Sequence, residues 1–200
     1  MIPAVLLAVA LLASACSGGG ASKGSAGANP TLATDPPTTT TTNPYAVPAT
    51  IDAVYVNRVL AGLDAQLGDV TRLLIRSGTF PEEAYDRLKA VYTDDQALQL
   101  KLDAFQSDLR RGFQDYKPSP GNKVTTVTRI ITASASCIFV EVRRDYSAVA
   151  LNSNVVNPQW TALKPSDPSR DPRRYNDTRW ALAYDSVQPN LAQPPNPCGS

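Results

Sequence analysis

The apolar periodicity of the chain changes once, at 119–122, and this change limits the possible folds more than any other feature. Before the turn sequence SPGN, apolar residues recur at spacings of three and four, the period of an amphipathic helix. After it, β-branched residues become frequent and alternate with polar ones, which is the period of a strand. Helices that all precede the strands predict an α+β domain, in which helices cover one face of an antiparallel sheet.

Three helices are predicted in the first part of the domain. The longest spans about 51–77 and is closed by Gly78. A second, short helix follows the capping-box sequence TFPE at 79–82, with proline just inside the helix start. The same capping chemistry at 93–96 opens a third helix, which ends before Pro118. The apolar positions of the three helices are Val56, Val59, Leu60, Leu63, Leu67, Val70, Leu74, Ala84, Tyr85, Leu88, Val91, Leu98, Leu102, Phe105, Leu109 and Phe113.

Four strands are predicted in the second part, the first two joined by a hairpin turn at 133–136. Their ranges are 123–134, 137–149, 159–164 and 178–187. In the last strand, two-residue alternation places Trp180, Leu182 and Tyr184 on one face. A polar loop at 165–177 joins the last two strands, and loops of this length are often functional or mobile.

This order of three helices and four strands resembles the cone-shaped NTF2-like superfamily over about 50–188. No strand is predicted between the second and third helices, where that family usually has one. The resemblance implies a sheet whose concave face can enclose a pocket. Enzymes, ligand-binding domains and scaffold domains all use this fold, so the resemblance leaves the function open.

The N-terminal apolar run at 2–12 is too short for a bilayer of ~30 Å, which needs roughly 20 residues, so it predicts a signal-peptide core. The following sequence ASAC, at 13–16, resembles the lipobox of bacterial lipoproteins. The resemblance implies lipid on the Cys16 thiol, cleavage after Ala15, and a mature protein anchored at the outer face of the cell membrane. Ordinary secretion with a free Cys16 thiol is the alternative.

Residues 16–47 are built largely of Gly, Ser, Ala, Thr, Pro and Asn, which predicts a disordered tether. Residues 48–200 then form a single α+β domain with a proline-rich C-terminal tail. With Cys16 lipidated, Cys137 and Cys198 remain as a pair, and an exported protein can keep a disulfide. The alternative is a buried Cys137 and a free Cys198 thiol.

The charge and the missing histidines exclude several function classes. The chain has 19 Lys and Arg against 18 Asp and Glu, a balance that argues against nucleic-acid binding. It has no histidine, which removes the usual general base, the usual catalytic triad and most transition-metal sites. We therefore predict no metal site, no cofactor and no enzymatic activity.

Five residues are candidates for binding. Glu141 lies within a strand and could line the concave face, but an ion pair with Arg143 on the same face explains it equally well. Trp160, Trp180 and Tyr184 could stack on a ligand or a partner, or could belong to the core.

The leading hypothesis is a membrane-anchored, non-catalytic envelope lipoprotein that binds a partner protein or a small apolar ligand. One alternative is a structural or assembly component of an envelope complex. Another is a carboxylate-based enzyme in an NTF2-like pocket, which would need a cavity containing Glu141 or an aspartate of raised pKa.

Overall fold

The computed structural model describes residues 46–152, 155–170, 174–186 and 192–199. The predicted signal peptide, Cys16 and nearly all of the predicted tether lie outside the described residues. The described ranges contain three α-helices followed by a four-stranded antiparallel sheet. The predicted α+β class, with helices preceding strands, is confirmed.

The helices are α1 (Ala53–Ser77), α2 (Glu82–Val91) and α3 (Asp95–Arg110). The α1 helix ends at Gly78, as predicted, with a left-handed φ of 62° that favours glycine. The predicted capping box before α2 is wrong, because the N-cap is Pro81 and no side chain caps the helix. None of the described helices combines the length and the apolar character needed to cross a membrane.

The α3 helix differs from the prediction at both ends. Its N-cap is Asp94, whose carboxylate accepts a hydrogen bond of 2.9 Å from the backbone N–H of Ala97. It ends at Arg110, so Phe113 is not on the helix as predicted but lies beyond it, with a φ of 52°. Phe113 is nevertheless buried, because the chain folds back and returns its ring to the core.

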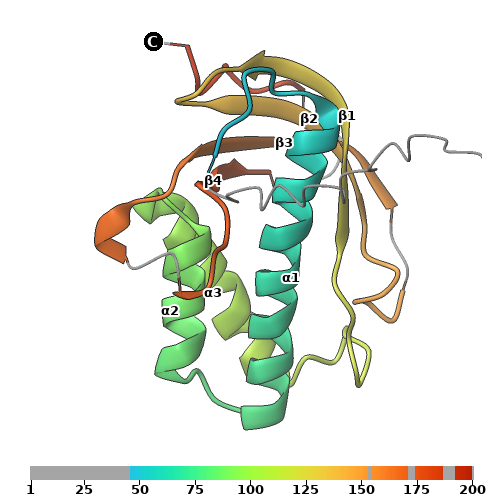
Figure 1. The fold of residues 1–200 in the computed structure, drawn as a ribbon. Coiled ribbons are helices and arrows are strands. Elements are labelled where there is room, and N and C mark those ends of the chain that lie inside the picture. The colour runs from blue at the N-terminus through green and yellow to red at the C-terminus, as the bar shows by residue number, and fades with distance from the viewer. Residues whose placement is uncertain (1–45, 153–154, 171–173, 187–191, 200) are drawn as a thin grey trace, which may run out of the picture. The chain divides into compact units, whose positions relative to one another are not determined.

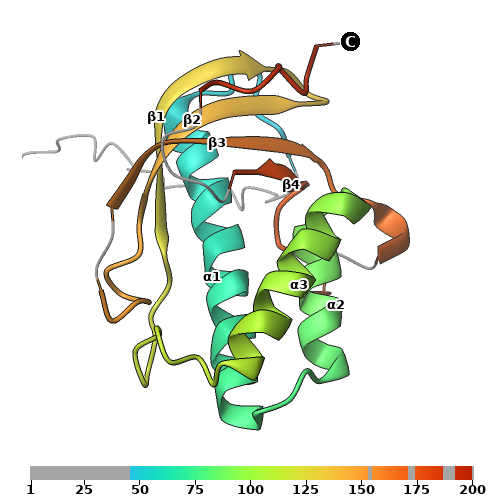
Figure 2. The same cartoon turned by 180° about the vertical axis from the view of Figure 1, so that it is seen from behind.

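The strands are β1 (Val124–Ala133), β2 (Ile138–Asp145), β3 (Val155–Pro165) and β4 (Trp180–Asp185). They lie in the order β1-β2-β3-β4, and all neighbours are antiparallel. Figures 1 and 2 show the three helices on one side of this sheet and the last part of the chain on the other. We call these the helix side and the tail side.

Alternate residues of the strands separate into two apolar clusters. The helix side contains Ile138, Val140, Val142, Leu163, Trp180 and Leu182, packed with residues of all three helices. The tail side contains Phe139, Trp160 and Ala162, against which Cys198 packs. The structure joins Cys137 to Cys198 in a disulfide, the pair that the sequence predicted, with Cα atoms 5.6 Å apart.

A register shift in β4 changes which of its residues face the helices. Leu163 of β3 pairs with Leu182, but the preceding Ala162 pairs with Tyr184, so Ala183 has no partner on β3. Because the extra residue resets the alternation, Tyr184 packs on the tail side and Asp185 faces the helix side. The prediction that Tyr184 shares a face with Trp180 and Leu182 is therefore wrong.

A single bridge lies between α2 and α3, where no strand was predicted. Tyr92 forms one parallel bridge with Leu182, and the Thr93 N–H donates to the Leu182 carbonyl at 3.0 Å. This bridge ties the start of α3 to the outer edge of β4.

Candidate functional site

The helix side of the sheet ends in four charged residues, which we call the charge cluster: Arg144, Asp185, Lys123 and Asp64. They come from β2, β4, the segment before β1, and α1. Arg144 and Asp64 are only 1% and 4% exposed. Charges this deep in a protein require partners, and the cluster supplies them internally.

Arg144 is the centre of the charge cluster. Its Nη1 donates to the Gln159 side chain at 2.5 Å and to the Ser186 carbonyl at 2.6 Å. Its Nη2 donates to the Thr161 hydroxyl at 2.5 Å and to the Asp185 carboxylate. Each terminal nitrogen of the guanidinium therefore donates two hydrogen bonds. The acceptors are side chains of β3 and β4 and the carbonyl of Ser186, the residue after β4.

Lys123 connects the two carboxylates of the cluster. Its Nζ lies 3.3 Å from Asp64 Oδ1 and 3.8 Å from Asp185 Oδ2. Asp64 also accepts a hydrogen bond of 2.9 Å from the backbone N–H of Thr125, which holds the start of β1 against α1. The cluster thus has two cations and two carboxylates, linked in the order Arg144, Asp185, Lys123 and Asp64.

Burial and pairing shift the acidities of these groups in different directions. Burial raises the pKa of Asp64, because the loss of hydration outweighs the attraction of Lys123 and the bond from Thr125. Burial also opposes ionisation of Asp185, but Arg144 and Lys123 outweigh it and hold the pKa of Asp185 below its ordinary value. Burial alone would lower the pKa of Lys123, yet the carboxylates of Asp185 and Asp64 raise it.

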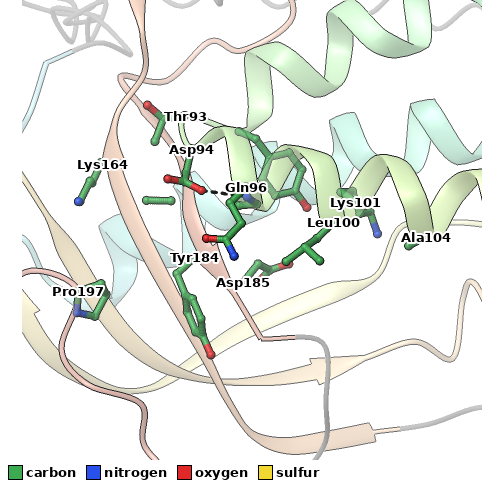
Figure 3. A pocket seen from close by; sticks show the side chains of 13 residues that line it. Thr93, Asp94, Gln96, Leu100, Lys101, Ala104, Lys164, Tyr184, Asp185 and Pro197 are labelled. Carbon is green, nitrogen blue, oxygen red and sulfur yellow. Dashed lines mark hydrogen bonds between the residues drawn. The ribbon is translucent and has the colours of Figure 1, made fainter.

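A pocket of about 670 Å³ opens between α3, β4 and the C-terminal tail (Figure 3). We call it the α3–β4 pocket. Its wall is largely apolar, with Asp185 of the charge cluster at one point of the lining. Its lining residues are Tyr92, Thr93, Asp94, Gln96, Ala97, Leu100, Lys101, Ala104, Lys164, Ala183, Tyr184, Asp185 and Pro197.

A second pocket, of about 270 Å³, lies between α1, α3 and the loops that flank the first two strands. Asp64 and Lys123 of the charge cluster line it, together with Asp108 and Tyr116, whose hydroxyl donates to Asp108 at 2.7 Å. Lys101 lines both pockets, so its side chain stands between them.

Lys101 is half-buried, and its charge is poorly compensated. Its ammonium lies 4.5 Å from the centre of the Phe105 ring, and it makes no ion pair with the described residues. Burial lowers the pKa of Lys101 to about 8, and repulsion by Lys123 acts in the same direction. Asp185 and Asp108 attract the ammonium from a distance, and Arg144 repels it.

We expect the free energy of unfolding to rise with pH above about 8 because of Lys101. In the unfolded chain Lys101 keeps its proton up to about 10.5, whereas in the folded chain it loses the proton near 8. Between these values the unfolded state binds more protons, so raising the pH favours the folded state. Urea denaturation between about pH 7 and 9.5 should show this rise, and Lys101→Met should abolish it.

The pH range of this measurement lies below the range in which the other nearby groups titrate. The pKa values of Tyr92 and Tyr116 are raised by burial and that of Lys123 by its carboxylates, so all three titrate at higher pH. A stability profile that is flat in the wild type, or that rises equally in Lys101→Met, would contradict the assignment to Lys101.

The aromatic residues predicted as binding candidates lie on both sides of the sheet, Trp180 on the helix side and Trp160 and Tyr184 on the tail side. Trp180 is buried on the helix side, where its Nε1–H donates to the Tyr55 hydroxyl at 2.8 Å. Trp160 is buried on the tail side, with its ring 6.0 Å from that of Phe139. Tyr184 alone of the three lines the α3–β4 pocket.

Glu141 and Arg143 lie on the tail side of β2, away from the charge cluster. Glu141 is in an ion pair, but its partner is Arg129 at 2.9 Å rather than Arg143. The reason is the register, which places Arg129 directly opposite Glu141 on the neighbouring strand. The Thr128 hydroxyl donates a further bond of 3.0 Å to Glu141, and Arg143 is exposed.

The charge cluster was missed by the sequence analysis, although part of it was visible there. Ile138, Val140 and Val142 alternate as the apolar face of β2, and Arg144 is the next residue of that face. The same alternation assigns Glu141 to the opposite face. The alternation of apolar residues along β2 therefore indicated that Arg144 faces the helices.

Comparisons with protein-family models, with curated proteins and with solved structures found no match for this chain. Within the described ranges, no three Cys, Asp or Glu side chains are grouped as a metal site would require. The candidate site is therefore argued from its own geometry, which consists of an apolar pocket beside a compensated charge cluster and one uncompensated lysine.

Proposed function

We propose that this chain is a lipid-anchored cell-envelope protein whose domain binds a small, largely apolar ligand in the α3–β4 pocket. The pocket itself is the observation that carries the proposal. Its volume of about 670 Å³ falls within the ~300–1,000 Å³ typical of small-molecule sites. Carbon atoms of Leu100, Ala104, Tyr184 and Pro197 form much of its wall, while a few polar groups converge on it.

The N-terminal sequence supports the anchored location. The small residues before Cys16 resemble a lipobox, and the tether that follows would hold the domain on the order of 30 Å from the membrane. We further propose that the domain is NTF2-like, on the order of its helices and strands. In that arrangement the ligand lies at the edge of the sheet that α3 covers.

Cys16→Ser should leave the chain unprocessed or release the protein from the membrane. The change removes the thiol to which lipid would be attached, and with it the anchor that the lipobox predicts. Fractionation of cells and mass measurement of the mature chain test this. Membrane association and mass equal to those of the wild type would contradict lipidation at Cys16.

Filling the α3–β4 pocket should abolish binding of an apolar probe. Ala104 is exposed on α3 and lines the pocket, so Ala104→Trp fills the space without entering the core. We expect the affinity for the neutral dye N-phenyl-1-naphthylamine, measured by fluorescence, to fall at least about tenfold. The measurement uses the Cys16→Ser chain with its disulfide formed, so that neither detergent nor an attached acyl chain competes.

A matched pair of helix-surface variants completes this experiment. Leu100→Asn removes an apolar side chain from the pocket wall and should weaken dye binding, because Leu100 is 62% exposed towards the opening. Val54→Asn makes the same kind of change at an exposed position of α1 outside both pockets and should have no effect. Absence of dye binding, or equal binding by all variants, would favour a structural or assembly role instead.

One observation bears on the enzyme alternative. Asp64 is a buried aspartate of raised pKa that lines the smaller pocket, which is the kind of residue that alternative needs. However, its two oxygens are engaged by the Thr125 backbone and by Lys123. The binding proposal is favoured because this carboxylate serves to join α1 to the sheet.

A further inference from the structure

We infer that the ligand of the α3–β4 pocket carries a single carboxylate headgroup, which binds the ammonium group of Lys101. The inference rests on the proposed function, since it concerns the same pocket, and it names the chemical class of the ligand. An apolar chain in the pocket and a carboxylate at Lys101 describe an amphiphile of the fatty-acid type.

The charges that line the pocket favour an anion. Of its two carboxylates, Asp185 binds Arg144 and Lys123, whereas Asp94 caps α3 with one oxygen and makes no ion pair with the described residues. Its two lysines, Lys101 and Lys164, make no ion pair with the described residues. Among the described lining residues, an entering anion would therefore meet two ammonium groups that have no ion-pair partner, against one such carboxylate, Asp94.

The charge cluster strengthens the case that an anion binds Lys101. Arg144 and Lys123 are balanced by Asp64 and Asp185, and Lys101 adds a fifth charge, which makes no ion pair with the described residues and is attracted by Asp185 and Asp108 only from a distance. A half-buried cation without a counterion is costly, and the Phe105 ring at 4.5 Å compensates it only in part. A ligand carboxylate would supply the missing counterion.

Lys101 rather than Lys164 is the residue that selects the headgroup. Lys164 is exposed, and ion pairs in water contribute little to affinity. Lys101 is half-buried against the protein, where the effective dielectric constant is lower than in water. An ion pair between a carboxylate and Lys101 is therefore stronger than one at Lys164. Figure 3 shows the two lysines on opposite sides of the pocket, so a carboxylate at Lys101 leaves the rest of the lining to the apolar chain.

Three probes of one chain length test the headgroup: decanoate, 1-decanol and decyltrimethylammonium. By titration calorimetry of the disulfide-bonded Cys16→Ser chain at about pH 7, we expect decanoate to bind at least about tenfold more tightly than decanol. The cationic probe should bind most weakly. Lys101→Gln should remove the preference for decanoate while leaving decanol affinity unchanged, and Lys101→Arg should keep most of it.

Lys164→Gln and Lys117→Gln are the matched controls, because Lys164 lies at the far side of the pocket and Lys117 lines neither pocket. Both should retain the preference for decanoate. A merely structural lysine would change the affinities for decanoate and decanol together.

A second measurement detects proton uptake by Lys101 when a carboxylate binds. A bound carboxylate stabilises the charged amine, so decanoate binding at about pH 8.5 should take up protons, and decanol binding should not. Calorimetry in buffers of different ionisation enthalpy measures this uptake, which Lys101→Gln should abolish.

Equal affinity for decanoate and decanol, or uptake that persists in Lys101→Gln, overturns the headgroup inference. Failure of every decyl probe and of the neutral dye instead overturns the proposed pocket itself.

Discussion

Replacing Arg144 by methionine should lower the free energy of unfolding by about 3–5 kcal/mol. The change leaves the part-buried Asp185 with Lys123, at 3.8 Å, as its remaining ion-pair partner among the described residues and with a hydrogen bond of 3.2 Å from the Thr161 hydroxyl. It also removes the donors that Gln159, Thr161 and the Ser186 carbonyl use. Urea denaturation followed by circular dichroism measures the loss, which is a large part of a typical stability of ~5–15 kcal/mol.

Two further variants show that the effect comes from the unpaired charge. Arg143→Met changes the adjacent arginine, which is exposed on the opposite side of β2, and should alter stability by less than about 0.5 kcal/mol. Arg144→Met combined with Asp185→Leu removes one charge of each sign and should recover much of the loss. Equal effects of the two arginine variants would contradict a central role for Arg144.

Removing the disulfide should also cost several kcal/mol. Cys137 and Cys198 are 61 residues apart, and closing a loop of that size is worth roughly 4 kcal/mol in the chain-entropy treatment, an upper figure. We expect Cys137→Ala with Cys198→Ala to lower the free energy of unfolding by about 2–4 kcal/mol. Amide exchange in 192–199 should accelerate as well, because prolines there limit other backbone pairing.

A reducing agent supplies the control for this variant. It should destabilise the wild type towards the level of the double variant and leave the double variant unchanged. Pro197 lines the α3–β4 pocket next to Cys198, so dye affinity should fall in parallel with the freed tail. Two reactive thiols from Cys137 and Cys198 in the unreduced, denatured protein would show that the bond is not formed.

The fold class could be predicted from the sequence because helix and strand periods are local properties. The apolar stripe from Val56 to Leu74 needs no partner to be recognised, and its residues are buried as expected. The limits of α3 were less predictable, since Asp94 and Thr93 are both good caps and only the surrounding packing decides between them.

The site was only partly predictable. Lys101 follows Leu98 by three residues and precedes Phe105 by four, so its place on the apolar face of α3 was visible in the helical period. Asp64 follows Leu60 by four residues and precedes Leu67 by three, so its place on the apolar face of α1 was visible in the same way. The way the helices cross the sheet decides whether these two side chains lie close to Arg144 and Asp185. No local sequence pattern encodes this crossing.

The unpaired Ala183 makes the chemistry of the interior depend on how β4 pairs with β3 as well as on the composition of β4. If β4 paired with β3 without this extra residue, Ala183 would lie opposite Ala162, and strict alternation would exchange the faces of Tyr184 and Asp185. Arg144 would then meet a phenol in place of its counterion. Deleting Ala183 would instead keep Tyr184 and Asp185 on their present faces, so a one-residue gap at this position in an alignment of related chains would mark an unchanged interior.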